Sequence, residues 1–176
     1  MTTAATDLTL SLSTVTAIIN APIEKVDIAD WLLHLPDAEY QRCSHAHIAA
    51  GNTTTDDGRP MSINVETIGD ALMVQHYVAE VHEPHLCKMV SISDSITANG
   101  RTKVEWTLSV KKIDDETCEY SNHRHGSAID ESVAFFEKHG ITLEKAREAR
   151  QIASDTHNKE ETPNFAKSLE RRALGK

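Results

Sequence analysis

The sequence predicts an α+β fold with seven antiparallel strands, two short helices after the first strand and a long helical region at the C-terminus. Three observations support this prediction. Residues 8–20 alternate apolar and hydroxylated side chains, which is typical of a half-buried strand. Residues 44–123 form short alternating runs separated by turn signals, which indicates an antiparallel meander. From Ser127 onward, apolar residues recur at helical spacing.

A helix is expected after the first strand, because Pro22 suits the first turn of a helix and the apolar residues after it recur at helical spacing. We expect this helix to run from Ile23 to about His34, before Leu35-Pro36 stops it. Residues 37–42 are a candidate for a second short helix.

Turn signals divide the middle of the chain into strands. They are Thr55 to Pro60, Gly69-Asp70, Glu83-Pro84, Asn99-Gly100 and Asp114-Asp115-Glu116. The expected strands cover 45–53, 60–68, 71–82, 85–96, 101–113 and 117–124. Six strands are therefore expected to follow the two helices.

The C-terminal region is expected to be helical in three pieces. The first helix is expected to end at His139-Gly140, and Thr142 is expected to cap the second. We expect the second piece to end near Glu161, because Thr162-Pro163 offers an N-cap and a first-turn proline for a last helical tail over 162–174.

Length and composition favour one globular domain over 1–176, with its core at about 8–161. The 176 residues are 39% hydrophobic, which is enough to bury a core. The formal charge of −9 repels polyphosphate, so we expect no nucleic-acid partner. No apolar run approaches the roughly 20 residues of a membrane span, and residues 1–8 lack signal-peptide features, so we expect a cytoplasmic location. The three cysteines lack CxxC spacing, which disfavours a disulfide framework or a cysteine zinc site.

The order of the expected elements resembles the helix-grip fold of the birch-pollen-allergen, START-like and polyketide-cyclase superfamily. The phrase TAIINAPIEKVDIADWL, a strand ending in Ala-Pro before the first helix, is similar to the opening of those proteins. The resemblance covers essentially the whole chain. It implies that a curved antiparallel sheet wraps the long C-terminal helix and leaves an apolar cavity for a small apolar or aromatic ligand.

The most specific local pattern is the HxxxE pair formed by His157 and Glu161. Residues four apart on a helix share one face, with Cβ atoms about 5–6 Å apart, so this pair is able to bind one metal ion. Glu160 is the alternative partner. Ala153 and Ala149, one and two turns earlier, are small and leave room for an ion or a substrate. The competing interpretation is an ordinary solvated helix face.

Two expected strands supply further candidates. His45 and His47 are two residues apart and so point to the same face of a strand, although a polar strand edge is the alternative. Glu66 lies near the end of a strand-like run, where a buried carboxylate is costly unless it is paired or binds a metal. If Glu66 faces the cavity, Ile63 and Val65 face outward unless a bulge intervenes, and an apolar outer face favours a homodimer.

Together these residues resemble the zinc site of the diacetylphloroglucinol and phloretin hydrolase family. In that family the last helix supplies an HxxxE pair and the sheet supplies one histidine and one glutamate. The resemblance implies a metal site made of His47, Glu66, His157 and Glu161, with His45 and Glu160 as substitutes. This chain departs from the family in being considerably shorter and in having a shorter separation between the strand histidine and the strand glutamate.

His76, Tyr77 and Tyr120 are the remaining candidates for catalysis. His76 shares a strand face with Val74 and Val78, so it is either a core histidine or a general acid or base in the cavity. Tyr77 and Tyr120 either hydrogen-bond a substrate oxygen or serve as amphipathic wall residues. The sequence has no Gly-rich phosphate loop, no GxSxG and no HExxH.

Three functions are compatible with these residues and resemblances. The first is a metal-dependent hydrolase of a small aromatic or polyketide-like ketone that cleaves a carbon–carbon bond, with a divalent ion, most plausibly zinc, and His76 as the base. The second is a carrier or sensor that holds an apolar ligand without chemistry. The third is a metal-free polyketide cyclase or isomerase that uses His or Tyr as acid and base.

Overall fold

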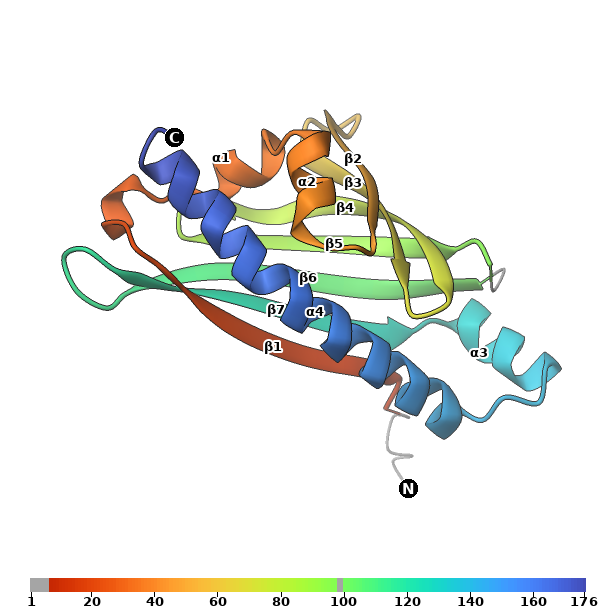
Figure 1. Cartoon of the computed structure of the whole chain (residues 1–176). Helices are drawn as coiled ribbons and strands as arrows, with labels where there is room; N and C mark the ends of the chain where they lie inside the picture. Colours follow the sequence, from red (N-terminus) through yellow and green to blue (C-terminus); the bar gives the residue numbers. More distant parts are fainter. Residues whose placement is uncertain (1–6, 98–99) are drawn as a thin grey trace, which may run out of the picture.

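The computed structural model describes residues 7–97 and 100–176. Seven strands form one antiparallel sheet in the order β1-β7-β6-β5-β4-β3-β2, which confirms the predicted α+β class. The strands are β1 (Thr9–Ile19), β2 (His47–Thr54), β3 (Pro60–Ile68), β4 (Ala71–Glu83), β5 (Leu86–Ser95), β6 (Gly100–Lys112) and β7 (Cys118–Ala128). The helices are the 3₁₀ turn η1 (Ile23–Lys25), α1 (Ile28–Leu33), α2 (Asp37–Cys43), α3 (Asp130–Lys138) and α4 (Leu143–Ala173). The long helix α4 crosses one face of the curved sheet, with α1 and α2 beside its C-terminal half (Figure 1).

The core lies between the inner face of the sheet, α1 and α4. The ring of Trp31 in α1 packs edge-on against Phe165 in α4, with centroids 5.2 Å apart, and its indole N–H donates to the Ser168 hydroxyl at 3.0 Å. Trp31 and Phe165 are fully buried. Burial of each such side chain contributes about 1.5–3 kcal/mol. These contacts anchor the C-terminal half of α4 and so position the polar residues that it carries.

The side chains of β3 alternate so that Glu66 faces inward, which the sequence leaves open. Asn64 and Glu66 are buried on the inner face, whereas Ile63 and Val65 are partly exposed on the outer face. A homodimer through this outer face stays a prediction, as does the cytoplasmic location. Within the described residues, no helix is long and apolar enough to cross a membrane.

Several predicted boundaries were wrong. The helix expected from Ile23 to His34 is divided into η1 and α1, because Asp27 caps α1 by accepting the backbone N–H of Asp30 at 2.8 Å. β2 begins at His47 instead of residue 45, and β7 continues to Ala128 instead of ending at residue 124. Of the expected Asn99-Gly100 turn, Asn99 lies outside the described residues.

The expected break at Thr162-Pro163 is absent from α4, so the separate tail over 162–174 was wrong. Thr162 caps no helix, because its hydroxyl donates to the Asn158 carbonyl one turn earlier, at 2.7 Å. Pro163 is exposed, and the Asn164 amide donates to the Glu160 carbonyl at 3.1 Å. Packing of the buried residues that follow the proline outweighs its local preference.

Replacing this proline tests that balance. We expect Pro163→Ala to raise the free energy of unfolding by about 1–3 kcal/mol, because alanine restores a backbone donor and removes the clash of the ring with the preceding turn. Urea unfolding followed by circular dichroism measures the change. Lys167→Ala, at an exposed position on the same helix, is the control and should change stability by less than about 0.5 kcal/mol. A clear loss of stability in Pro163→Ala would show that the packing of α4 needs the proline.

Candidate active site

Four buried titratable side chains meet between the sheet and α4. They are His47 at the start of β2, Glu66 in β3, and His157 and Glu161 in α4. One ligand atom from each lies within 4.8 Å of the others. The β2–β3 register pairs His47 with Glu66, and one turn of helix joins His157 to Glu161. The fold therefore brings together the four residues that the sequence singled out.

The separations between these atoms suit the donors of one metal ion. The Glu66 Oε2 lies 3.0 Å from the His157 Nε2 and 3.6 Å from the His47 Nε2. The Glu161 Oε2 lies 3.3 Å and 3.2 Å from the same two nitrogens. Ligands about 2.0–2.1 Å from a tetrahedral ion lie about 3.3 Å from one another. The four nitrogen–oxygen distances are close to that value.

The His47 ring is oriented as a metal ligand would be. Its Nδ1 lies 2.7 Å from the Tyr40 carbonyl oxygen, which only accepts, so Nδ1 donates and Nε2 is the nitrogen turned to the site. The Tyr40 ring stacks on the imidazole, with centroids 3.8 Å apart and an interplanar angle of 3°. A backbone carbonyl that holds the second nitrogen is the usual partner of a metal-bound histidine. The His47 Nε2, 3.2 Å from the Glu161 Oε2, is thus the nitrogen that would bind an ion.

His157 supplies a second indication that the group fits a cation. Among the described residues, neither of its ring nitrogens has a hydrogen-bond partner, although Nε2 lies only 3.0 Å from Glu66. The contact is short, yet it lacks hydrogen-bond geometry. The His157 Nε2 also lies 3.3 Å from the Glu161 Oε2, so it forms ion pairs with both carboxylates when protonated and is free to bind a cation when neutral. A divalent ion that accepts both nitrogen and oxygen ligands would satisfy the His157 Nε2, so the residues fit such an ion.

Arg124 and Asn122 in β7 belong to this site, and the sequence analysis missed both. The Arg124 Nη2 lies 2.8 Å from the Glu161 Oε1, and its Nη1 lies 3.6 Å from the Glu66 Oε1. The Asn122 amide donates to the same Glu161 oxygen at 2.9 Å. Both residues hold the Glu161 Oε1, so its Oε2 points to the histidines. The available signal was their alternation with Tyr120 on one face of the last predicted strand.

Tyr40 in α2 is a further residue that the sequence analysis missed. Its hydroxyl donates to the Glu66 Oε2 at 3.1 Å, and its carbonyl holds His47. Burial, with the nearby Glu66 and Glu161 charges, raises the pKa of Tyr40 well above its ordinary value, so the phenol stays protonated as a donor. Nothing in the sequence near Tyr40 separates it from an ordinary core tyrosine.

The site is electrostatically balanced without a metal. Burial raises the pKa of Glu66, but the charges of His157 and Arg124 outweigh burial and hold it at about 2. Burial also opposes the ionisation of Glu161, yet Arg124 and His157 hold its pKa well below the ordinary value. Burial lowers the pKa of His157, whereas the two carboxylates raise it, with a net rise to about 10. Two carboxylates thus face two cations.

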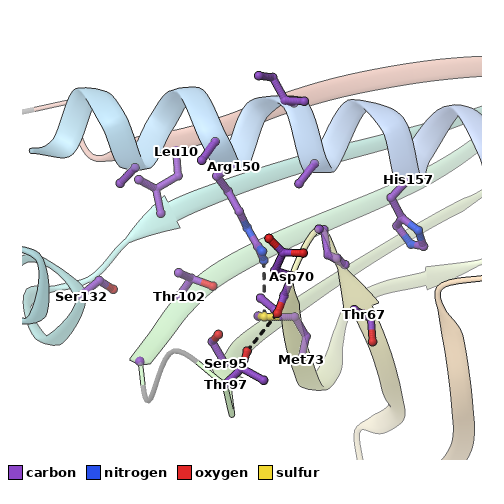
Figure 2. A pocket seen from close by; sticks show the side chains of 18 of the residues that line it. Leu10, Thr67, Asp70, Met73, Ser95, Thr97, Thr102, Ser132, Arg150 and His157 are labelled. Carbon is purple, nitrogen blue, oxygen red and sulfur yellow. Dashed lines mark hydrogen bonds between the residues drawn. The ribbon is translucent and has the colours of Figure 1, made fainter. Parts of the chain in front are cut away.

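A cavity of about 840 Å³ opens beside the four residues (Figure 2). It lies between α3, the first half of α4 and the strand ends that join β3 to β4 and β5 to β6. His157 lines it, as do Ala149 and Ala153 on the same helix, which were expected to leave this space. A ligand in the cavity therefore has access to the His157 side of the group.

The structure places His45, Glu160 and His76 away from the four-residue group. His45 is exposed before β2, and its Nδ1 contacts the Glu160 Oε1 at 2.7 Å, so this pair does not substitute for His47 and Glu161. The prediction that His76 faces the cavity was wrong. Its side chain is 43% exposed on the outer face, 3.9 Å from Asp94, because Tyr77 and its alternate neighbours occupy the inner face.

Tyr77 and Tyr120 lie on the inner face near the site but outside the large cavity. Both are fully buried, and within the described residues neither hydroxyl has a hydrogen-bond partner. Neither residue lines the 840 Å³ cavity as the structure describes it. Burial raises the pKa of both phenols, so they stay protonated. Their placement matches the expectation of wall residues more closely than that of substrate-binding ones.

Comparison with known proteins agrees with the fold and leaves the chemistry open. No protein-family model and no curated protein sequence matches the chain. The Zhui aromatase/cyclase from Streptomyces sp. R1128 is 11% identical, with a TM-score of 0.66 over 92% of this chain and 94% of that chain. A START superfamily protein from Mycobacterium smegmatis is 14% identical, with a TM-score of 0.56 over 93% and 97% of the two chains. A point mutant of norcoclaurine synthase from Thalictrum flavum is 13% identical, with a TM-score of 0.54 over 98% of both.

These similarities, at such low sequence identity, establish the fold alone. The chain has the helix-grip fold of START-like proteins, as the order of its predicted elements indicated. The resemblance to the diacetylphloroglucinol and phloretin hydrolases stays a prediction that rests on the four site residues.

Proposed function

We propose that this protein is a metal-dependent hydrolase that cleaves a carbon–carbon bond of a small aromatic or polyketide-like ketone in the cavity. The observation that carries the proposal is the convergence of His47, Glu66, His157 and Glu161 at the separations of metal donors. Zinc is the proposed ion, because two imidazoles and two carboxylates are ligands that it accepts in tetrahedral sites.

The chemistry of such a site divides between the ion and the chain. A bound divalent ion polarises a ketone carbonyl and lowers the pKa of water toward 7. Arg124 and Asn122 hold Glu161, and the Tyr40 hydroxyl holds Glu66, so both carboxylates keep one orientation during turnover. The apolar cavity walls orient the ring of the substrate and exclude bulk water. His76 takes no part, since it lies on the outer face.

The overall reaction balances with water as the only co-reactant. The water oxygen adds to the carbonyl carbon, and the bond from that carbon to the neighbouring ring or chain carbon breaks. The electron pair of the broken bond stays on the departing carbon, which takes up a proton. The products are a carboxylic acid and the shortened aromatic or ketone.

Elemental analysis of the purified protein tests this proposal. We expect about one zinc ion per chain in the parent protein, and its loss in both His157→Ala and Glu161→Ala. Glu160→Ala is the matched control, because Glu160 neighbours Glu161 on the same helix but contacts His45, and this variant should keep the metal. A parent that turns over acylated phenols or β-diketones only with the metal supports the hydrolase. A folded parent that binds no zinc even after zinc is added back overturns it.

The charge balance of the site favours one second candidate, a metal-free cyclase or isomerase. Arg124 and a protonated His157 already offset Glu66 and Glu161, so the site does not depend on an ion for neutrality. His157 would then donate its proton to a substrate carbonyl from the cavity wall. This candidate predicts turnover that survives a chelator and is lost in His157→Gln. Ligand binding without any turnover would instead indicate a carrier or sensor.

A further inference from the structure

Arg150 extends from α4 into the apolar cavity without an acidic partner (Figure 2). Within residues 7–97 and 100–176 its guanidinium forms no ion pair, and its hydrogen-bond contact is Nη2 to the Met73 Sδ at 3.8 Å. By contrast, the buried Arg124 lies 2.8 Å from a carboxylate. Burial lowers the pKa of Arg150, but a guanidinium remains charged in proteins.

Arg150 is partly buried, and an unpaired cation there gives up part of its hydration without gaining a counter-charge. Two other cationic side chains line the same cavity and differ in this respect. Arg101 is paired with Asp94 at 3.1 Å and with Glu131 at 3.7 Å, and Lys145 is exposed at the start of α4. Among these three lining residues, Arg150 alone is partly buried and has no acidic partner in the described part of the chain. A negatively charged ligand would offset the lost hydration of the Arg150 guanidinium.

Two buried hydroxyls on the cavity wall also lack partners. The Ser95 Oγ in β5 and the Thr102 Oγ1 in β6 have no hydrogen-bond partner among the described residues, and both residues line the cavity (Figure 2). A hydroxyl is able to donate to an oxyanion. The surrounding wall is largely apolar and includes Leu10 and Phe135. The largely apolar cavity wall therefore holds one partly buried, unpaired guanidinium and two unpartnered hydroxyls just beneath its surface.

We propose that Arg150 is the anchor of an oxyanion subsite, so that the cavity takes a small apolar molecule that carries a carboxylate or a phenolate. Arg150 and His157 line the same cavity, and Arg150 also lies with His157 and Arg124 along a smaller adjoining space. A molecule anchored at Arg150 is thus directed toward the four-residue group. As a statement about the substrate, this inference rests on the proposed function. As a statement about binding, it stands without a metal.

Calorimetric titration with matched pairs of probes tests the subsite. The probes are 2-naphthoate against the neutral 2-naphthamide for a carboxylate, and 4-nitrophenolate against 4-nitroanisole for a phenolate. Both the purified protein and a chelator-treated sample are titrated, since a bound metal would itself attract an anion. We expect at least one anion to bind about tenfold or more tightly than its neutral partner in both samples, because hydrogen bonds to a charged group carry that much free energy.

Substitutions identify the residue that is responsible for the preference for the anionic probe. Arg150→Gln should abolish the preference for the anion while keeping the affinity for the neutral probe, which also reports that the cavity is intact. Arg150→Lys should keep part of the preference, because it keeps the charge but loses the planar fork. Lys145→Gln is the matched control and should keep all of it. The probe pair that shows the preference identifies the carboxylate or the phenolate as the anion.

The inference is overturned if anion and neutral probe bind equally, if the preference disappears with the chelator, or if Lys145→Gln reduces it as much as Arg150→Gln. Metal analysis of the same samples separates this result from the proposed function. A preference that depends on Arg150 in a protein without metal supports the subsite and counts against the hydrolase. A protein that binds metal but shows no preference for the anionic probe supports the metal site of the proposed hydrolase and overturns the subsite.

Discussion

Arg124→Leu should lower the free energy of unfolding of the metal-free protein by about 3–5 kcal/mol. The substitution leaves Glu66 and Glu161 buried close together, with His157 as the remaining cation in contact with both. Removal of one partner from a buried charged network costs this much, because the charges left behind can neither pair nor hydrate. Chemical denaturation of the chelator-treated parent and variant, followed by circular dichroism, measures the difference.

Two comparisons sharpen this experiment. Arg101→Leu is the matched control, because Arg101 pairs with two acids at the surface, and its loss should cost no more than about 1 kcal/mol. Zinc at about a hundredfold excess over its dissociation constant should return about 2.7 kcal/mol to any variant that still binds it. Equal losses in Arg124→Leu and Arg101→Leu would mean that the buried carboxylates do not depend on Arg124.

Phe165→Ala should destabilise the protein by about 3–5 kcal/mol, the usual cost when a buried aromatic side chain becomes a cavity. Phe165 is fully buried, meets Trp31 edge-on at 5.2 Å and lies 5.7 Å from the ring of His47. Its loss removes an aromatic contact between α4 and α1. Thermal and urea unfolding both measure the effect, and metal content should fall as well, since the packing around His47 loosens.

Ile152→Ala is the control for that experiment. Ile152 lies on the same helix but is 63% exposed, so its truncation should change stability by less than about 0.5 kcal/mol. A small effect of Phe165→Ala would show that α4 is held to the sheet mainly by its polar contacts, such as those of Asn158 with Ser13 and Asn122.

Local sequence patterns were enough to predict the elements and the helical half of the site. Side chains that alternate with a period of two, together with the turn residues between them, locate seven strands. Both signals are local properties of the sequence. The pairing of His157 with Glu161 is likewise local, since residues four apart on a helix share a face wherever the helix packs. Glu66 was singled out as a carboxylate in a strand-like run, but the alternation of β3 left its face open, because an inward Glu66 sends Ile63 and Val65 outward.

Which strand residues face the site depends on long-range packing. His47 points inward and His45 does not, because β2 starts at His47 and its pairing with β3 is irregular between His47 and Ala49. Both faces of β4 carry apolar residues, so alternation alone could not show that His76 faces outward. Packing of α4 against the core likewise overrode the local signal at Pro163. Arg124, Asn122 and Tyr40 reach Glu161 and Glu66 across long stretches of sequence, and such contacts depend on non-local packing that no local pattern encodes.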